Sequence, residues 1–176
     1  MEKFPIFYIY PAATIVGILF HLAFTRRERT PEFVFGVIVS YAIFFNIGVA
    51  GLMAFYAHAF MPERVAAYIG WPAGNPFQFE VACANLAFGI LGVLCVWMRS
   101  TFRLAAILGY SIFLIGAAYG HLQQMQLAHN MALGNAGAPL YVDIILPPVL
   151  LALWIVHYVI AKRGRANAYT AEGASL

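Results

Sequence analysis

The chain alternates between long apolar stretches and short polar ones. Five stretches are apolar enough to cross a bilayer, which takes about 20 residues of helix. The predicted spans cover residues 6–25, 33–60, 79–98, 103–123 and 140–161. No polar linker divides the chain, so the pattern predicts one helical-bundle domain over residues 1–161 and a basic, partly flexible tail over residues 162–176.

The composition excludes a soluble domain. Of the 176 residues, 63% are hydrophobic and 10% are charged, with a mean hydropathy of +0.81, whereas soluble domains carry about 25% charged residues. A soluble fold of this length has nowhere to bury so much apolar surface. We therefore predict an all-α, polytopic membrane helix bundle with five transmembrane helices and without a nucleic-acid partner.

The basic residues predict the orientation of the bundle. Eight of the ten Lys and Arg residues fall on one side of the predicted spans. They are Arg26, Arg27, Arg29, Arg99, Arg103, Lys162, Arg163 and Arg165. Because positive residues are retained on the cytoplasmic side, the N-terminus is expected outside and the C-terminus in the cytoplasm, which an odd number of spans also requires.

Four ionisable side chains lie near the outer ends of four different predicted spans: His58, Glu80, His121 and Asp143. Ionisable groups within spans are costly and usually face the bundle interior or a cavity. We predict that these four residues form a ligand-binding polar pocket on the extracytoplasmic side. The alternative is that both acids are solvated residues of a first helical turn, where the helix dipole favours a carboxylate.

Other polar and small residues predict close packing between helices. Amides within spans bond across helix contacts, and small residues let two backbones approach. The residues predicted to pack in this way are Asn46, Asn85, Gly89, Gly92, Gly116 and Gly120.

The residue types leave several chemistries open. There is no HExxH, no CxxC and no pair of histidines on one helical face, so we predict no metal site, and the isolated His21 and His157 do not favour haem. The cofactor is left unknown, with a quinone or lipid favoured over metal or haem. Glu80 or Asp143 could also act as a base in proton transfer, and a non-catalytic subunit would dock a partner.

One part of the chain resembles a known group. Residues 79–123 contain an acid that opens a span, the run "FGILGVL", a short Arg-flanked turn and a span ending in "AAYGH". This pattern resembles the DoxX-like small bacterial membrane proteins, which are usually four-helix bundles. The resemblance implies a multi-pass protein of the bacterial inner membrane and an accessory role beside quinone-reactive oxidoreductase complexes, with Glu80 and His121 as the positions carried over.

Two functions remain open at this point. The first is an integral membrane protein that binds a small lipid-soluble ligand in the outer pocket, or serves as an accessory subunit. Its partners would be membrane lipids, further copies of the chain or another membrane protein. The second is a membrane-embedded enzyme or redox subunit that uses the His and carboxylate cluster on a quinone-like or lipid-like substrate.

Overall fold

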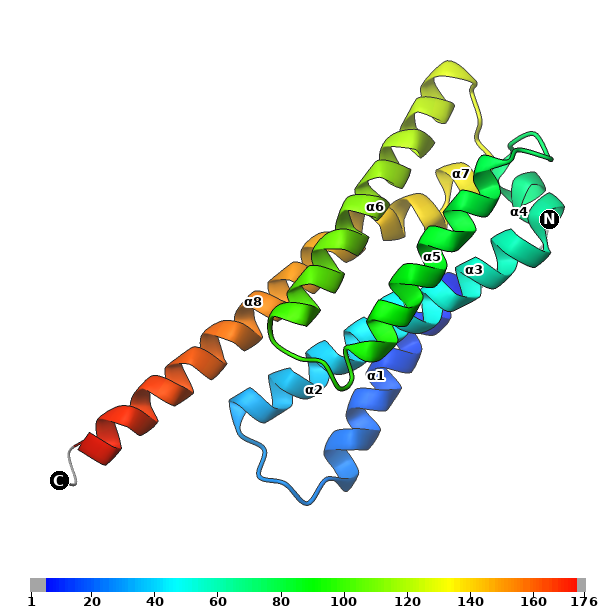
Figure 1. The fold of residues 1–176 in the computed structure, drawn as a ribbon. Helices are drawn as coiled ribbons and strands as arrows, with labels where there is room; N and C mark the ends of the chain where they lie inside the picture. The colour runs from blue at the N-terminus through cyan, green and yellow to red at the C-terminus, as the bar shows by residue number, and fades with distance from the viewer. Residues whose placement is uncertain (1–5, 174–176) are drawn as a thin grey trace.

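The computed structural model describes residues 6–173, and its side chains over residues 8–167. Within residues 6–173 every regular element is a helix (Figure 1), which confirms the predicted all-α class. In chain order the elements are α1 Ile6–Phe24, α2 Pro31–Ile43, the π-helix η1 Phe44–Val49, α3 Ala50–Phe60, α4 Pro62–Ile69, α5 Phe77–Leu94, α6 Thr101–Leu127, α7 Leu133–Ala136 and α8 Ala138–Gly173.

The predicted spans coincide with the long helices. Four stretches in the described chain are long and apolar enough to cross a membrane: Pro31–Phe60, Phe77–Leu94, Thr101–Leu127 and Leu133–Asn167. The first predicted span is α1, whose part with described side chains, Tyr8–Phe24, is a shorter apolar helix. The chain is therefore a multi-pass membrane protein. Helix α8 continues to Gly173, so the predicted tail is helical up to that residue, and residues 174–176 lie outside the described part.

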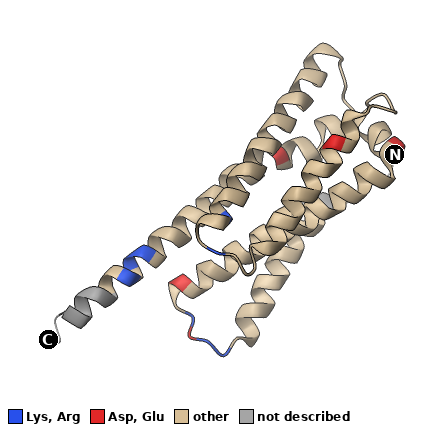
Figure 2. Cartoon of the chain, in the orientation of Figure 1, with Lys and Arg blue, Asp and Glu red and all other residues tan. Residues whose placement is uncertain are grey.

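The bundle has two different ends. The α1–α2 loop and the α5–α6 turn lie at one end, and α4 and α7 lie at the other (Figure 1). Most basic residues gather at the first end, which we call the basic end (Figure 2). It comprises Arg26, Arg27, Arg29, Arg99, Arg103, Lys162, Arg163 and Arg165. The other end, with α4, α7 and the loops beside them, is called the loop end. That the basic end faces the cytoplasm stays a prediction.

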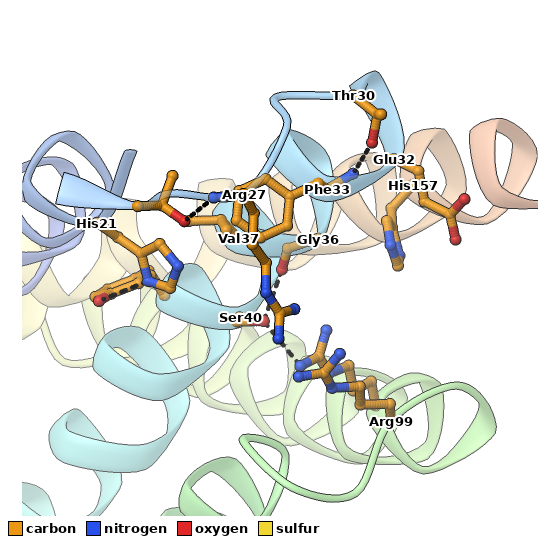
Figure 3. Close-up of a pocket in the computed structure, with 13 residues that line it drawn as sticks. His21, Arg27, Thr30, Glu32, Phe33, Gly36, Val37, Ser40, Arg99 and His157 are labelled. Carbon is orange, nitrogen blue, oxygen red and sulfur yellow. Dashed lines mark hydrogen bonds between the residues drawn. The ribbon is translucent and has the colours of Figure 1, made fainter. Parts of the chain in front are cut away.

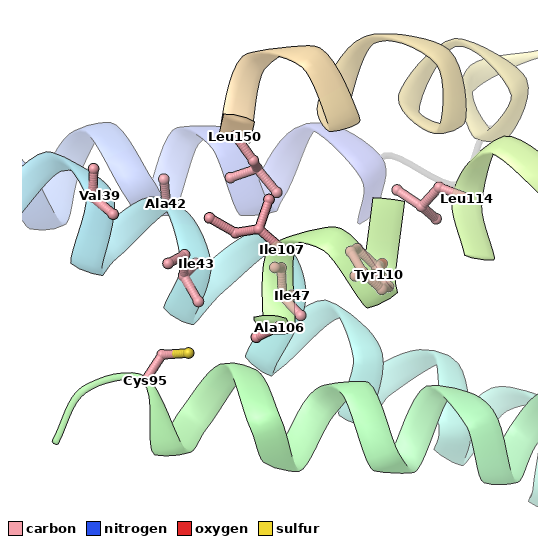
Figure 4. Close-up of a cluster of buried hydrophobic side chains, with 10 residues drawn as sticks. All are labelled: Val39, Ala42, Ile43, Ile47, Cys95, Ala106, Ile107, Tyr110, Leu114 and Leu150. Atoms are coloured by element: carbon pink, nitrogen blue, oxygen red, sulfur yellow. The ribbon is translucent and has the colours of Figure 1, made fainter. Parts of the chain in front are cut away.

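An apolar core joins the helices in the middle of the bundle. Side chains from α2, η1, α6 and α8 meet there (Figure 4), among them Ile43, Ile47, Ile107 and Leu150, which are at most 2% exposed. Large apolar side chains also cover the outside, for example Phe20 at 64% and Ile112 at 72% exposure. A lipid environment accommodates such an apolar surface, whereas water does not.

Glycines bring α5 into backbone contact with α3 and η1. A Cβ placed on Gly89 would lie 2.8 Å from the backbone nitrogen of Leu52, and one on Gly51 would lie 2.9 Å from the carbonyl oxygen of Asn85. Gly92 approaches the backbone of Gly48 in η1 in the same way. Only residues without a side chain allow two helix backbones to pack so closely.

The two predicted packing amides act differently. Asn46 lies in η1 and its Nδ2 donates to Thr14 Oγ1 of α1 at 2.9 Å and to the carbonyl of Ala42 at 3.0 Å. It therefore links two helices across the core. Asn85 donates to the carbonyl of Val81 in its own helix at 2.9 Å, so its amide makes a local bond while its backbone takes part in the glycine contact.

Gly116 and Gly120 of α6 do not lie in a helix contact, contrary to the packing prediction. A Cβ on either residue would meet nothing within 4 Å. Within the described chain they support no close helix contact, because α6 packs on α8 through a different face, with Ile107, Leu114 and Ala118 buried.

The glycine contact predicts opposite effects of one substitution at two positions. Gly89→Ala should lower the free energy of unfolding by about 1–3 kcal/mol, because the new methyl group overpacks the α3–α5 contact. Gly116→Ala is the matched control and should be neutral or stabilising by up to about 1 kcal/mol, because alanine favours the helix and the position is open. Thermal unfolding in a mild detergent measures both. Equal effects of the two substitutions would contradict this account of the contact.

Candidate functional site

Two of the four residues predicted for the outer pocket meet at the loop end. His121 of α6 and Asp143 of α8 are each 8% exposed. The Nε2 atom of His121 lies 3.7 Å from Oδ2 of Asp143. This distance is too long for a hydrogen bond but short enough for an ion pair. The pair connects the two long helices where α7 folds in between them.

Asn135 of α7 fixes the orientation of this histidine. Its side chain is fully buried, and its Nδ2 donates to the carbonyl oxygens of His121 at 3.2 Å and of Asn130 at 2.9 Å. Its Oδ1 therefore faces Nδ1 of His121 at 2.8 Å. Because an amide oxygen only accepts, Nδ1 carries the hydrogen. Nε2 then presents a lone pair to the carboxyl group of Asp143. The two side chains attract each other only when one of them holds a further proton.

The other two predicted residues do not join this pair. Glu80 is exposed in the first turn of α5 and makes no hydrogen bond or ion pair within the described chain. It fits the alternative of a solvated carboxylate at a helix N-terminus. His58 lines a separate cavity of about 50 Å³ beside Trp71 and Gln78, and its buried Nδ1 has no hydrogen-bond partner there. This cavity has room for a water molecule but not for a head group.

A much larger cavity lies at the basic end, where the sequence analysis placed no site. Its volume is about 630 Å³, within the range of about 300–1,000 Å³ that is typical of ligand sites. The α1–α2 loop, α2, the α5–α6 turn and α8 surround it (Figure 3). We call it the basic cavity. Its arginine, glutamate and histidine lining residues are His21, Arg27, Glu32, Arg99, Arg103 and His157.

Arg103 is the fixed part of this lining. It is 3% exposed. Its Nε donates to the carbonyl of Cys95 at 3.0 Å, and one terminal nitrogen donates to Ser40 Oγ at 2.8 Å. Ser40 in turn donates to the carbonyl of Gly36 at 2.6 Å. The guanidinium therefore joins the end of α5, the start of α6 and the middle of α2, but no carboxylate neutralises its charge in the described chain.

The remaining charged side chains of the cavity are unpaired. Arg27 in the α1–α2 loop and Arg99 in the α5–α6 turn extend into the same space (Figure 3). Neither guanidinium makes a hydrogen bond or ion pair with any described residue, and Glu32 has no arginine within 4.0 Å. Charged groups that converge on a cavity without pairing with one another are suited to binding a ligand of opposite charge.

Each of the two histidines of the cavity contacts a neighbouring residue. The Nδ1 atom of His21 lies 3.3 Å from the hydroxyl of Tyr41. His157 of α8 packs against Gly36, where a Cβ would lie 3.3 Å from its Nε2. Over the described residues, no three His, Cys, Asp or Glu side chains come together in a way that could hold a metal ion.

The loop-end network predicts a substitution series at Asp143. Asp143→Asn should preserve stability, because the new amide can donate to Nε2 of His121. Asp143→Leu should lower the free energy of unfolding by about 1–3 kcal/mol, the usual cost of a buried polar atom without a partner. The exposed Gln123→Leu is the control and should change little. Thermal unfolding in detergent measures the series, and equal stability of the Asn and Leu variants would contradict the predicted contact.

Comparison with known proteins places the chain in a family. No curated protein and no solved structure matches it, and the resemblance to DoxX-like proteins stays a prediction. One family model matches residues 4–163, which include every predicted span to its end and all the residues of the basic cavity. The chain belongs to this family, described as a family of unknown function, DUF6790.

Proposed function

We propose that this membrane protein binds an amphiphile whose anionic head group enters the basic cavity at the end predicted to face the cytoplasm. The apolar part of the ligand lies along the outside of the helices. The proposal keeps the predicted lipid-soluble ligand and transfers its head group from the loop end to the basic end. The membrane remains that predicted from the sequence, a bacterial inner membrane.

The charge of the cavity is the observation that carries the proposal. Three guanidinium groups line it, at Arg27, Arg99 and Arg103, and none of them is paired with a carboxylate among the described residues. Arginine binds carboxylates and phosphates through two parallel N–H groups, and such charge-assisted bonds are stronger than neutral ones. An anion in the cavity would supply the acceptors that the described chain does not provide.

The place of the cavity favours a membrane ligand. It lies where the bundle meets the predicted inner surface of the bilayer, and basic pockets between helices at this level bind anionic lipid head groups. Lys162, Arg163 and Arg165 of α8 add positive charge at the same end. Such a field raises the local concentration of anions.

The loop end is less suited to this role. His121 and Asp143 contact each other, and the amide of Asn135 makes its hydrogen bonds within the chain. The cavity beside His58 is about 50 Å³, against about 630 Å³ at the basic end. We therefore assign the loop-end network to the positioning of α6, α7 and α8 rather than to ligand binding.

The proposal predicts that anionic lipid stabilises the protein through the free arginines. Phosphatidylglycerol added to the protein in mild detergent should raise the melting temperature more than phosphatidylcholine does. At a concentration about 100 times the Kd, one bound ligand adds about 2.7 kcal/mol. Arg27→Gln and Arg99→Gln should each weaken the effect, because a hydrogen bond to a charged group contributes about 1.5–3 kcal/mol.

Arg26→Gln is the matched control for both variants. Arg26 is exposed in the same loop as Arg27 and does not line the cavity, so this variant removes the same charge without touching the site. It should respond to phosphatidylglycerol as the wild type does. If phosphatidylglycerol and phosphatidylcholine stabilise the wild type equally, or if all three variants lose the same amount, the proposed site is wrong.

A further inference from the structure

We infer that the group held in the basic cavity is a phosphomonoester, which carries close to two negative charges, rather than a singly charged carboxylate or phosphodiester. This inference rests on the proposed function. It adds the chemical class of the ligand, and it follows from the balance of charges around the cavity.

The lining carries two uncompensated positive charges. Three arginines and one glutamate contribute to it, and Glu32 offsets the formal charge of one guanidinium. A phosphomonoester carries about −1.5 to −2 at pH 7, which matches this remainder. A phosphodiester or a carboxylate carries one negative charge and would leave one arginine of the cavity without a counter-charge.

The geometry of the arginines also suits a group with several acceptor oxygens. Arg103 is fixed by Cys95 and Ser40, while Arg27 and Arg99 approach from two different loops and have no other partner in the described chain. A phosphomonoester has three terminal oxygens, which can accept from donors on different sides. A carboxylate has two oxygens in one plane and is best bound by one arginine side on.

Glu32 distinguishes a doubly charged ligand from a singly charged or zwitterionic one. It is the one acid in the cavity lining and makes no ion pair within 4.0 Å among the described residues. Its carboxylate repels any anion in the cavity, so it lowers affinity for all of them. A ligand with two negative charges retains enough attraction to the three arginines, whereas a zwitterionic head group would use Glu32 as the partner of its amine.

The phosphomonoester has two possible sources. It can be the head group of a membrane lipid, for which phosphatidic acid is the simplest probe. It can also be a water-soluble organic phosphate, for which glycerol 3-phosphate is the matching probe without acyl chains. The chemistry recognised by the cavity is the same in both cases, and direct comparison of the two probes distinguishes the sources.

The test measures binding of matched lipids to the full chain in mild detergent. Phosphatidic acid should bind about tenfold or more tightly than phosphatidylglycerol with the same acyl chains, because the second charge gains a further charge-assisted contact. Glycerol 3-phosphate and inorganic phosphate are titrated against bound phosphatidic acid. Displacement at similar concentrations supports a soluble phosphate as the ligand, and no displacement supports a lipid.

Glu32→Gln tests the charge balance without disturbing the fold, since Glu32 is exposed. It should tighten binding of phosphatidic acid by about fivefold, because a like charge leaves the cavity. Glu63→Gln is the control, as Glu63 is an exposed acid at the loop end, and it should change nothing. Tight binding of phosphatidylethanolamine that Glu32→Gln weakens would overturn the inference in favour of a zwitterion.

The outcomes separate this inference from the proposed function. If phosphatidylglycerol binds as tightly as phosphatidic acid and both need Arg27 and Arg99, the anion site stands and the phosphomonoester is wrong. If neither lipid binds more tightly than phosphatidylcholine, the site itself is wrong and the inference falls with it.

Discussion

The buried guanidinium of Arg103 is the contact on which the basic end depends. It bonds to the carbonyl of Cys95 after α5 and to the hydroxyl of Ser40 in α2, so one side chain fixes the positions of three helices. A charge buried without a carboxylate is costly, and helix backbone and hydroxyl groups compensate it here only in part. The open side of the cavity is where an anion would complete the compensation, which couples ligand binding to the packing of α2, α5 and α6.

The two ends of the bundle arrange their polar and charged side chains differently. At the loop end, His121 of α6 contacts Asn135 of α7 and Asp143 of α8, so polar groups link three helices and leave little space. At the basic end, the arginines stay apart and enclose about 630 Å³. Between the ends, glycines bring α3 and α5 into backbone contact. This contact holds α3 against α5, while polar groups occupy the two ends of the bundle.

The sequence predicts the helices well because long apolar runs have only one stable form in a membrane. It also predicts that His121 and Asp143 lie at one level. The prediction that Glu80 joins the pocket is wrong. Asn85 lies five residues further along α5 and therefore points about 140° away from Glu80. Because Asn85 is buried, Glu80 is turned outward. The basic cavity is missed for another reason. Arg27, Arg99 and His157 are far apart in sequence, and a positive-inside interpretation already accounts for the arginines, so no local pattern marks them as a site.

Native mass spectrometry of the protein released from its own membrane tests the central claim most directly. The account predicts that the wild type retains an anionic adduct and that the Arg27→Gln, Arg99→Gln double variant does not, while Arg26→Gln retains it. A wild type that emerges without any adduct, or an adduct that the double variant retains equally well, would contradict the claim that these arginines bind an anionic ligand.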